Sequence, residues 1–292
     1  MHKAKQFFFA GIVSVQERRL LMNQRKSLKE LNLLDKFLFD EAMDDPENVK
    51  TMLDIILSQN TNLKHPPQTE KEQRTSTDNR QIRLDVYAID EDDVIYEVEA
   101  QKENTHNLPK RSRLYQGIID SKLLPPGVVD FNLLNEVLIV LIMPFDLFGY
   151  GLYRYTFQMK CEEVPELKLD DGATRIFLNT RGKHPELVSP ELIELLKYME
   201  HSTDEISEAC ESKRIQEMHR RVCQIKASEK AEVKYMQTWE EKILIKQEGE
   251  RIGLERINRL NQKLIEQGRF DDLTKATSDS SYQEKLLKEF KI

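Results

Sequence analysis

A change in hydrophobic spacing near residue 82 limits the possible folds of this chain more than anything else in it. Apolar and polar residues alternate over 82–88 and again over 94–101, and a period of two is typical of β-strands with one buried face. A helical pattern follows over 109–123, and then an almost unbroken apolar run over 136–143, as in a strand covered on both faces. Strand, helix and buried strand together predict a βαβ crossover with a parallel pair.

Further helices and strands are predicted around this unit. Ser27–Glu30 forms a capping box, and a helix is predicted to run from it to Ala42. The triplet Asp45-Pro46-Glu47 starts a second helix, with the aspartate as N-cap and the proline in the first turn. We predict a loop or an irregular edge segment over 58–79 and two more strands over 153–159 and 174–179.

The sequence after Ser189 is helical in pattern and heavily charged. A heptad phase that Lys246 and Glu250 interrupt predicts a partial coiled coil, which is a route to a homo-oligomer through the C-terminal helices. Two short helices are predicted over 264–290. We place a domain boundary near Gly182–Ser189, between a core (27–185) and a helical C-terminal region (186–292). Residues 1–26 form an N-terminal extension, which an alternative start at Met22 would shorten.

Composition narrows the class of protein. Charged residues make up 33% and hydrophobic residues 39% of the 292 residues, which favours helix-rich, solvated structure over disorder. The longest apolar runs, 7–13 and 137–143, are far shorter than the roughly 20 residues of a membrane-spanning helix. Three widely spaced cysteines and six histidines without metal-ligand spacing indicate reduced thiols and no zinc site, so we expect a cytoplasmic protein. The net charge of −7 argues against coating of nucleic acid by bulk charge but allows a local basic patch.

Acidic residues on the predicted hairpin are the best candidates for chemistry. Asp85 lies on the polar face of the first strand, and Glu99 and Gln101 share the polar face of the second. Directly opposed residues of an antiparallel pair share a face, so Asp85 meets Glu99 if the loop has three residues, 91–93. A two-residue loop would put Val98 opposite Asp85 unless a bulge intervened.

Two converging carboxylates are suited to a hard cation. With the Ala100 carbonyl, Asp85 and Glu99 would offer an all-oxygen site for Mg²⁺ or Mn²⁺. Gln101 can orient a bound water but can neither carry positive charge nor take up a proton. The spacing by itself also fits a merely solvated acidic face, and the metal interpretation requires both carboxylates on one side of the sheet with no lysine bridge filling the space.

Five short segments occur along the chain in a fixed order: Leu34–Phe39, Ile82–Tyr87, Tyr96–Gln101, Leu108–Gln116 and Asp171–Thr180. Over about residues 27–200 the chain thereby resembles the Rpn-type recombination-promoting nucleases, also described as PD-(D/E)XK nuclease family transposases. The resemblance rests on the order of the segments, since no one of them is specific. It implies an α/β (α+β) fold with a restriction-endonuclease-like PD-(D/E)XK core, a mixed sheet flanked by helices, that cuts DNA phosphodiester bonds with a divalent metal.

The same resemblance implies roles for individual residues. Asp85 and Glu99 take the places of the two acids of the motif, and Gln101 takes the place usually held by lysine, where glutamine is common in this branch. Two positions depart from the pattern. Glu97 adds negative charge beside the metal, and Gln81 stands where glycine is expected.

Residues on two helices complete the expected site. An acid from the first helix often assists in this superfamily; Asp35 is the best placed, with Asp40 and Glu41 as rivals. Basic residues at the start of the helix after the hairpin could hold the phosphate backbone of DNA without reading its sequence, or could simply be solvated. These residues are Lys110, Arg111 and Arg113.

Three functions follow from these observations. The first is a Mg²⁺-dependent DNA endonuclease linked to recombination or mobile elements. The second is an inactive nuclease fold that serves as a DNA-binding or scaffold protein, which the glutamine at 101 and the acidic composition favour. The third is a nuclease directed at RNA.

Overall fold

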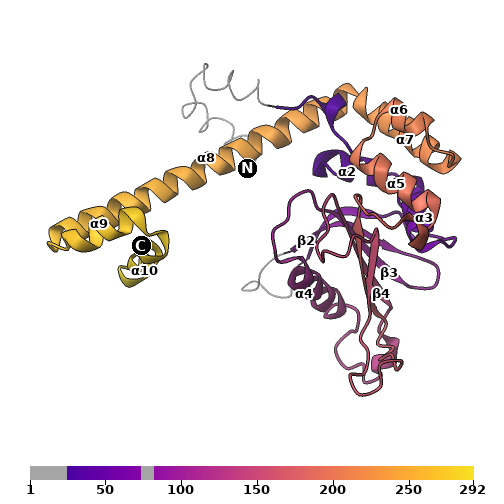
Figure 1. The fold of residues 1–292 in the computed structure, drawn as a ribbon, viewed down its shortest axis with the longest axis horizontal. Coiled ribbons are helices and arrows are strands. Elements are labelled where there is room, and N and C mark those ends of the chain that lie inside the picture. The colour runs from indigo at the N-terminus through magenta and orange to yellow at the C-terminus, as the bar shows by residue number, and fades with distance from the viewer. Residues whose placement is uncertain (1–24, 74–81) are drawn as a thin grey trace. The chain divides into compact units, whose positions relative to one another are not determined.

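The computed structural model describes residues 25–73 and 82–292, and it shows a mixed α/β fold with a six-stranded sheet flanked by helices (Figure 1). The strand order is β1-β2-β3-β4-β6-β5, in which β3, β4 and β6 are parallel and the other pairs are antiparallel. The strands are β1 (Gln68–Gln73), β2 (Ile82–Ile89), β3 (Ile95–Ala100), β4 (Val137–Met143), β5 (Arg154–Phe157) and β6 (Ala173–Asn179). All strands predicted from the hydrophobic spacing are therefore present.

β2 and β3 form the predicted hairpin in the register of a three-residue loop. Val86 pairs with Val98, and Ile89 pairs with Ile95. The backbone N–H of Asp90 donates to the carbonyl of Val94 at 3.1 Å, which closes the loop over 91–93. Continued by one residue beyond the regular ladder, this register puts Asp85 across from Glu99.

The predicted crossover is confirmed. Helix α4 (Leu108–Asp120) joins β3 to the parallel strand β4, whose alternate residues Val137 and Ile139 pack with Ile118 and Ile119 of the helix. Helices α2 (Lys36–Met43), α3 (Pro46–Leu57) and α5 (Pro190–Glu200) lie on the other side of the sheet (Figure 1). Both faces of the sheet are thus covered, as its nearly unbroken apolar central strand requires.

The prediction of one continuous helix from Ser27 to Ala42 is wrong, because residues 31–35 are not helical. The capping box is present, but it closes only a short 3₁₀ turn (Leu28–Glu30), and α2 begins at Lys36. Between them, the N–H of Leu33 donates to Ser202 Oγ at 3.0 Å. The Asn32 side chain also donates to the carbonyl of Glu200. These tertiary hydrogen bonds satisfy the backbone outside a helix, which the apolar spacing could not reveal.

The second predicted helix start is confirmed by α3, whose N-cap Asp45 accepts the N–H of Glu47 at 2.9 Å. The segment 58–79 contains the edge strand β1, and its last six residues lie outside the described part of the chain. The N-terminal extension also lies outside it, apart from residues 25 and 26.

The chain divides into two compact units, the first ending at Ala231 and the second spanning Glu232–Ile292. The first unit includes α5, α6 (Asp204–Glu208) and α7 (Lys213–Lys226). The predicted boundary near Gly182–Ser189 falls inside this first unit. α5 contacts α3, and α7 contacts both α2 and α3, so these helices complete the core that covers the sheet.

The second unit contains most of α8 (Glu229–Glu266) together with α9 (Phe270–Ser278) and α10 (Ser280–Glu289), the two short helices that were predicted. Its small core consists of Leu260, Leu264, Ala276 and Leu286. No helix in 25–73 or 82–292 is both long and apolar enough to cross a membrane.

Candidate functional site

Two glutamates of β3 lie on the face of the sheet that α4 covers. Alternation along the strand puts Glu97 and Glu99 on the side of Ile95, which belongs to the core packed against α4. Glu97 is 0% exposed and Glu99 is 8% exposed. Arg111 reaches back from the first turn of α4, and its Nη2 lies 2.5 Å from Glu99 Oε1. A buried carboxylate needs a counter-charge, and Arg111 supplies it.

Asp85 is also buried, but its counter-charge comes from α2. Lys36 Nζ pairs with Asp85 Oδ1 and, at 3.1 Å, with Asp40 Oδ2. By ion-pair geometry Asp85 is paired with Lys36 and Glu99 with Arg111, and each cation also acts electrostatically on the other acid.

The strand is irregular at Asp85. Leu84 and Tyr87 both join the core beneath α4, although residues three apart in a regular strand face opposite sides. The neighbouring residue on the edge strand, Glu70, has a positive φ of 49°. The ladder between β1 and β2 accordingly omits the Glu70–Asp85 pair, and the Asp85 carboxylate contacts Lys36 of α2.

Burial and mutual repulsion make the carboxyl groups of this cluster hard to ionise. Burial raises the pKa of Glu99 to about 7, with Asp85 adding to the rise and Arg111 opposing it. Burial raises the pKa of Glu97 well above its usual value, and the charges of Glu99 and Asp85 raise it further. Burial likewise raises the pKa of Asp85, against the effect of Lys36, and that of Asp40 to about 7. A cluster of this kind favours an added cation.

The residues present fit a hard cation. Oε2 of Glu99 is buried and makes no hydrogen bond of regular geometry in the described part of the chain, although the Tyr115 hydroxyl lies near enough to interact with the carboxyl group. Both oxygens of Glu97 are likewise buried without a hydrogen bond in this part of the chain. Carboxylate oxygens are the ligands that Mg²⁺ and Mn²⁺ prefer. A buried carboxylate oxygen without a hydrogen bond is therefore a candidate ligand for such an ion.

Gln101 and Ala100 lie at the end of β3. Arg111 Nη2 donates to Gln101 Oε1 as well as to Glu99, and Gln101 Nε2 donates to the carbonyl of Glu103 at 2.6 Å. Both ends of the Gln101 amide are thus engaged within the chain. Ala100 is the last residue of the strand and pairs with Ile142 of β4.

Of the three acids considered on the first helix, Asp40 is the one joined to Asp85, through Lys36. Asp35 is the N-cap of α2 and forms an ion pair with Lys102 instead. Glu41 lies on the same helix as Asp40.

The three basic residues at the start of α4 do not act as one patch. Lys110 and Arg113 are exposed, whereas Arg111 is turned toward Glu99 and is half-buried. Arg111 is thus engaged by the buried carboxylate of Glu99, and contact of these basic residues with DNA stays a prediction.

Two features escaped the sequence interpretation. One is Lys36, whose four-residue spacing from Asp40 was the available signal. The other is a separate cluster of Asp204, His219 and Cys223, for which the four-residue spacing of His219 and Cys223 on α7 was the signal.

Comparisons of the chain with protein-family models, with curated proteins and with solved structures found no match. The function is therefore inferred from the site itself.

Proposed function

We propose that this protein is a divalent-metal-dependent endonuclease that hydrolyses DNA phosphodiester bonds at a site around Asp85 and Glu99. The observation that carries the proposal is the unpaired buried oxygen of Glu99 within a cluster of carboxyl groups with raised pKa values. Leaving such a group unsatisfied costs about 1–3 kcal/mol, and a bound cation would remove that cost. The resemblance to PD-(D/E)XK nucleases of the Rpn type supports the same assignment.

Each residue of the site has a distinct role in this proposal. Asp85 and Glu99, with the Ala100 carbonyl, would hold Mg²⁺ or Mn²⁺, which when bound neutralises phosphate charge and acidifies water. Lys36 and Arg111 place positive charge beside the two acids, which Gln101 at the lysine position cannot do.

Surrounding residues support this arrangement. Asp40 holds Lys36 in place, and Asp35 is the second candidate for the helix acid. The exposed side chains of Lys110 and Arg113 would contact DNA phosphates and orient the duplex without reading its sequence.

The test is cleavage of supercoiled plasmid with Mg²⁺ and with excess EDTA. We expect the wild-type protein to nick or linearise plasmid with Mg²⁺ alone, and Asp85→Asn and Glu99→Gln each to lower the rate at least about 100-fold, since each removes a ligand of the ion. Glu103→Gln is the matched control, because Glu103 is an exposed glutamate just beyond the same strand. Wild-type cutting by both site variants would refute the mechanism.

A catalytically inactive DNA-binding or scaffold protein is the second candidate. The observation in its favour is that Lys36 and Arg111 already neutralise Asp85 and Glu99. It predicts DNA binding without cleavage and with an affinity that Glu99→Gln does not change. Cleavage of matched DNA and RNA substrates side by side distinguishes the DNA endonuclease from an RNA-directed one.

A further inference from the structure

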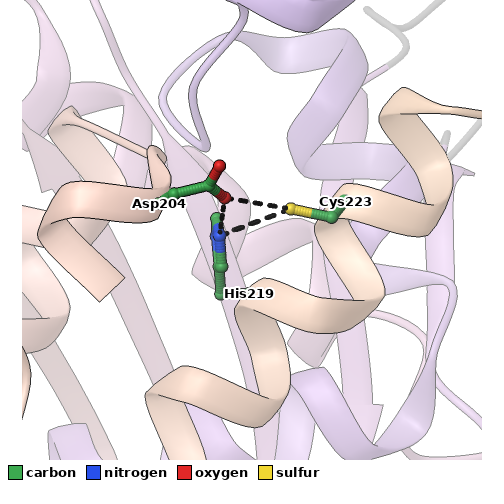
Figure 2. A group of neighbouring side chains, drawn as sticks. All are labelled: Asp204, His219 and Cys223. Atoms are coloured by element: carbon green, nitrogen blue, oxygen red, sulfur yellow. Dashed lines mark hydrogen bonds and ion pairs between the residues drawn. The ribbon is translucent and has the colours of Figure 1, made fainter. Parts of the chain in front are cut away.

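Three side chains in the helical layer of the first unit point toward one another (Figure 2). His219 and Cys223 lie one turn apart on α7, and Asp204 is the first residue of α6. His219 Nε2 lies 2.8 Å from Asp204 Oδ1 and 3.3 Å from Cys223 Sγ. The sulfur lies 3.9 Å from the same carboxylate oxygen.

This arrangement differs from a cysteine–histidine–aspartate catalytic triad. In a triad the nucleophile and the acid bind different nitrogens of the imidazole, so that a proton can pass from one side of the ring to the other. Here the thiol and the carboxylate both face Nε2, and Nδ1 is hydrogen-bonded to the hydroxyl of Tyr198 at 3.0 Å. Three different ligand atoms within 4.8 Å of one another can instead bind a common ion.

We propose that Asp204, His219 and Cys223 bind a divalent transition metal, with Zn²⁺ the ion that fits best. Ligand atoms placed tetrahedrally at the usual Zn²⁺ distances lie about 3.3–3.6 Å from one another. Of the three observed separations, 2.8 Å lies below that range, 3.3 Å at its lower limit and 3.9 Å above it, so small side-chain movements bring all three atoms to it. A set of one nitrogen, one sulfur and one oxygen suits Zn²⁺ and not Mg²⁺, which prefers oxygen alone. Cys223 would bind as the thiolate and release its proton to solvent.

The surroundings of His219 support this assignment. A histidine that binds metal through one nitrogen nearly always donates its other N–H to a fixed partner. Tyr198, which is fully buried, occupies that position, so that with Nε2 on the metal the Nδ1–H donates to the tyrosine oxygen. Tyr198 is thus a positioning residue for His219.

The site is also accessible. The three side chains line an open cavity of about 430 Å³, to which Glu205 and Lys226 also contribute. The Asp204 side chain is 79% exposed. Three protein ligands beside an open cavity leave the fourth position to water or to an outside ligand. A bound ion would also tie α6 to α7.

The test is titration of the metal-free, full-length protein with Co²⁺, followed by Zn²⁺. We expect one equivalent of Co²⁺ to produce a thiolate-to-metal charge-transfer band with the visible absorption of a tetrahedral site, and Zn²⁺ to abolish both. Cys223→Ser should remove the charge-transfer band, and Asp204→Asn should weaken Zn²⁺ binding at least tenfold. Cys210→Ser is the matched control, since that thiol contacts the carbonyl of Ile206 and not the cluster. Tyr198→Phe should weaken Zn²⁺ binding by about 10–100-fold while leaving the band in place.

A wild-type protein without the charge-transfer band would overturn the proposal, as would a band that persists in Cys223→Ser. Asp204→Asn serves if the cysteine variant does not fold, because the exposed position of Asp204 makes its substitution harmless to the core. The site is independent of the proposed nuclease site. Asp85→Asn should leave the Co²⁺ spectrum unchanged, and Cys223→Ser should leave Mg²⁺-dependent plasmid cleavage unchanged, so the two proposals succeed or fail separately.

Discussion

Asp40, Asp85, Glu97 and Glu99 form a series of carboxyl groups that interact electrostatically, and the pKa of each is raised above its usual value. The unfolded chain releases the protons of these groups above about pH 4. The folded protein keeps them to a higher pH, which is about 7 for Asp40 and Glu99. Stability falls with rising pH wherever the folded state binds more protons than the unfolded state. These groups consequently lower the free energy of unfolding as the pH rises between these two values. Groups with raised pKa values that lower the free energy of unfolding are common in functional sites.

Glu97→Gln should reduce this pH dependence, because the amide is uncharged at every pH and its nitrogen and oxygen replace two unpaired carboxyl oxygens. Urea denaturation at pH 5 and pH 8 measures it. We expect the wild-type protein to lose more unfolding free energy between these pH values than Glu97→Gln does, and Glu103→Gln to behave as wild type. Equal losses in wild type and Glu97→Gln would show that Glu97 ionises normally.

Mg²⁺ should stabilise the wild-type protein more at pH 8 than at pH 5.5. Protons compete with the ion for Glu99, whose pKa is raised to about 7, so the ion binds better above that value. Thermal unfolding without Mg²⁺ and with roughly 10 mM Mg²⁺, a concentration at which a weak site fills, measures the shift in melting temperature. The shift should vanish in Glu99→Gln. A shift that is independent of pH, or one that persists in this variant, would place the ion elsewhere.

Two glycines show how the same residue type serves different elements. Gly182 follows β6, and a Cβ built there would lie 2.3 Å from Cγ of Tyr153, the residue before β5. The absence of a side chain at 182 lets the Tyr153 ring lie against the backbone. Gly249 lies within α8, where a Cβ would meet nothing within 4 Å. Glycine is needed at the first position for close packing, and at the second it only weakens the helix.

The substitution to alanine should therefore have opposite signs at these positions. Gly182→Ala should lower the unfolding free energy by about 1–3 kcal/mol because Tyr153 must move. Gly249→Ala should raise the stability of α8 by up to about 1 kcal/mol through helix propensity. Chemical denaturation followed by circular dichroism measures both. A neutral Gly182→Ala would mean that the ring relocates freely.

Two units of very different size make up the whole molecule. The sheet and its covering helices form an extensive core in the first unit, whereas the core of the second rests on four buried residues, Leu260, Leu264, Ala276 and Leu286. A core of this size gives marginal stability. We expect the second unit to unfold separately and at a lower temperature than the first.

Leu264→Ala should destabilise the second unit by about 2–5 kcal/mol, since it opens a cavity in this small core. Calorimetry should show the lower-temperature transition shifted or lost and the higher one unchanged. Leu254→Ala is the control, because Leu254 lies on the same helix but is 63% exposed. A single cooperative transition that moves as a whole in Leu264→Ala would show that the units unfold together.

Local patterns were enough to predict much of this protein. Alternation, the acidic turn and helix caps act between neighbours in the chain, so the hairpin, the crossover through α4 and the start of α3 could be predicted from the residues themselves. The register of the hairpin stayed open between two loop lengths until the structure showed the longer one. The contacts of the candidate site could not be predicted in this way. Lys36 pairs with Asp85 across 49 positions of sequence, and no local rule specifies which cation a buried carboxylate will find. Packing and hydrogen bonding between segments distant along the chain also decide three other features. These are the late start of α2, the boundary after Ala231 and the contact of Asp204 with α7.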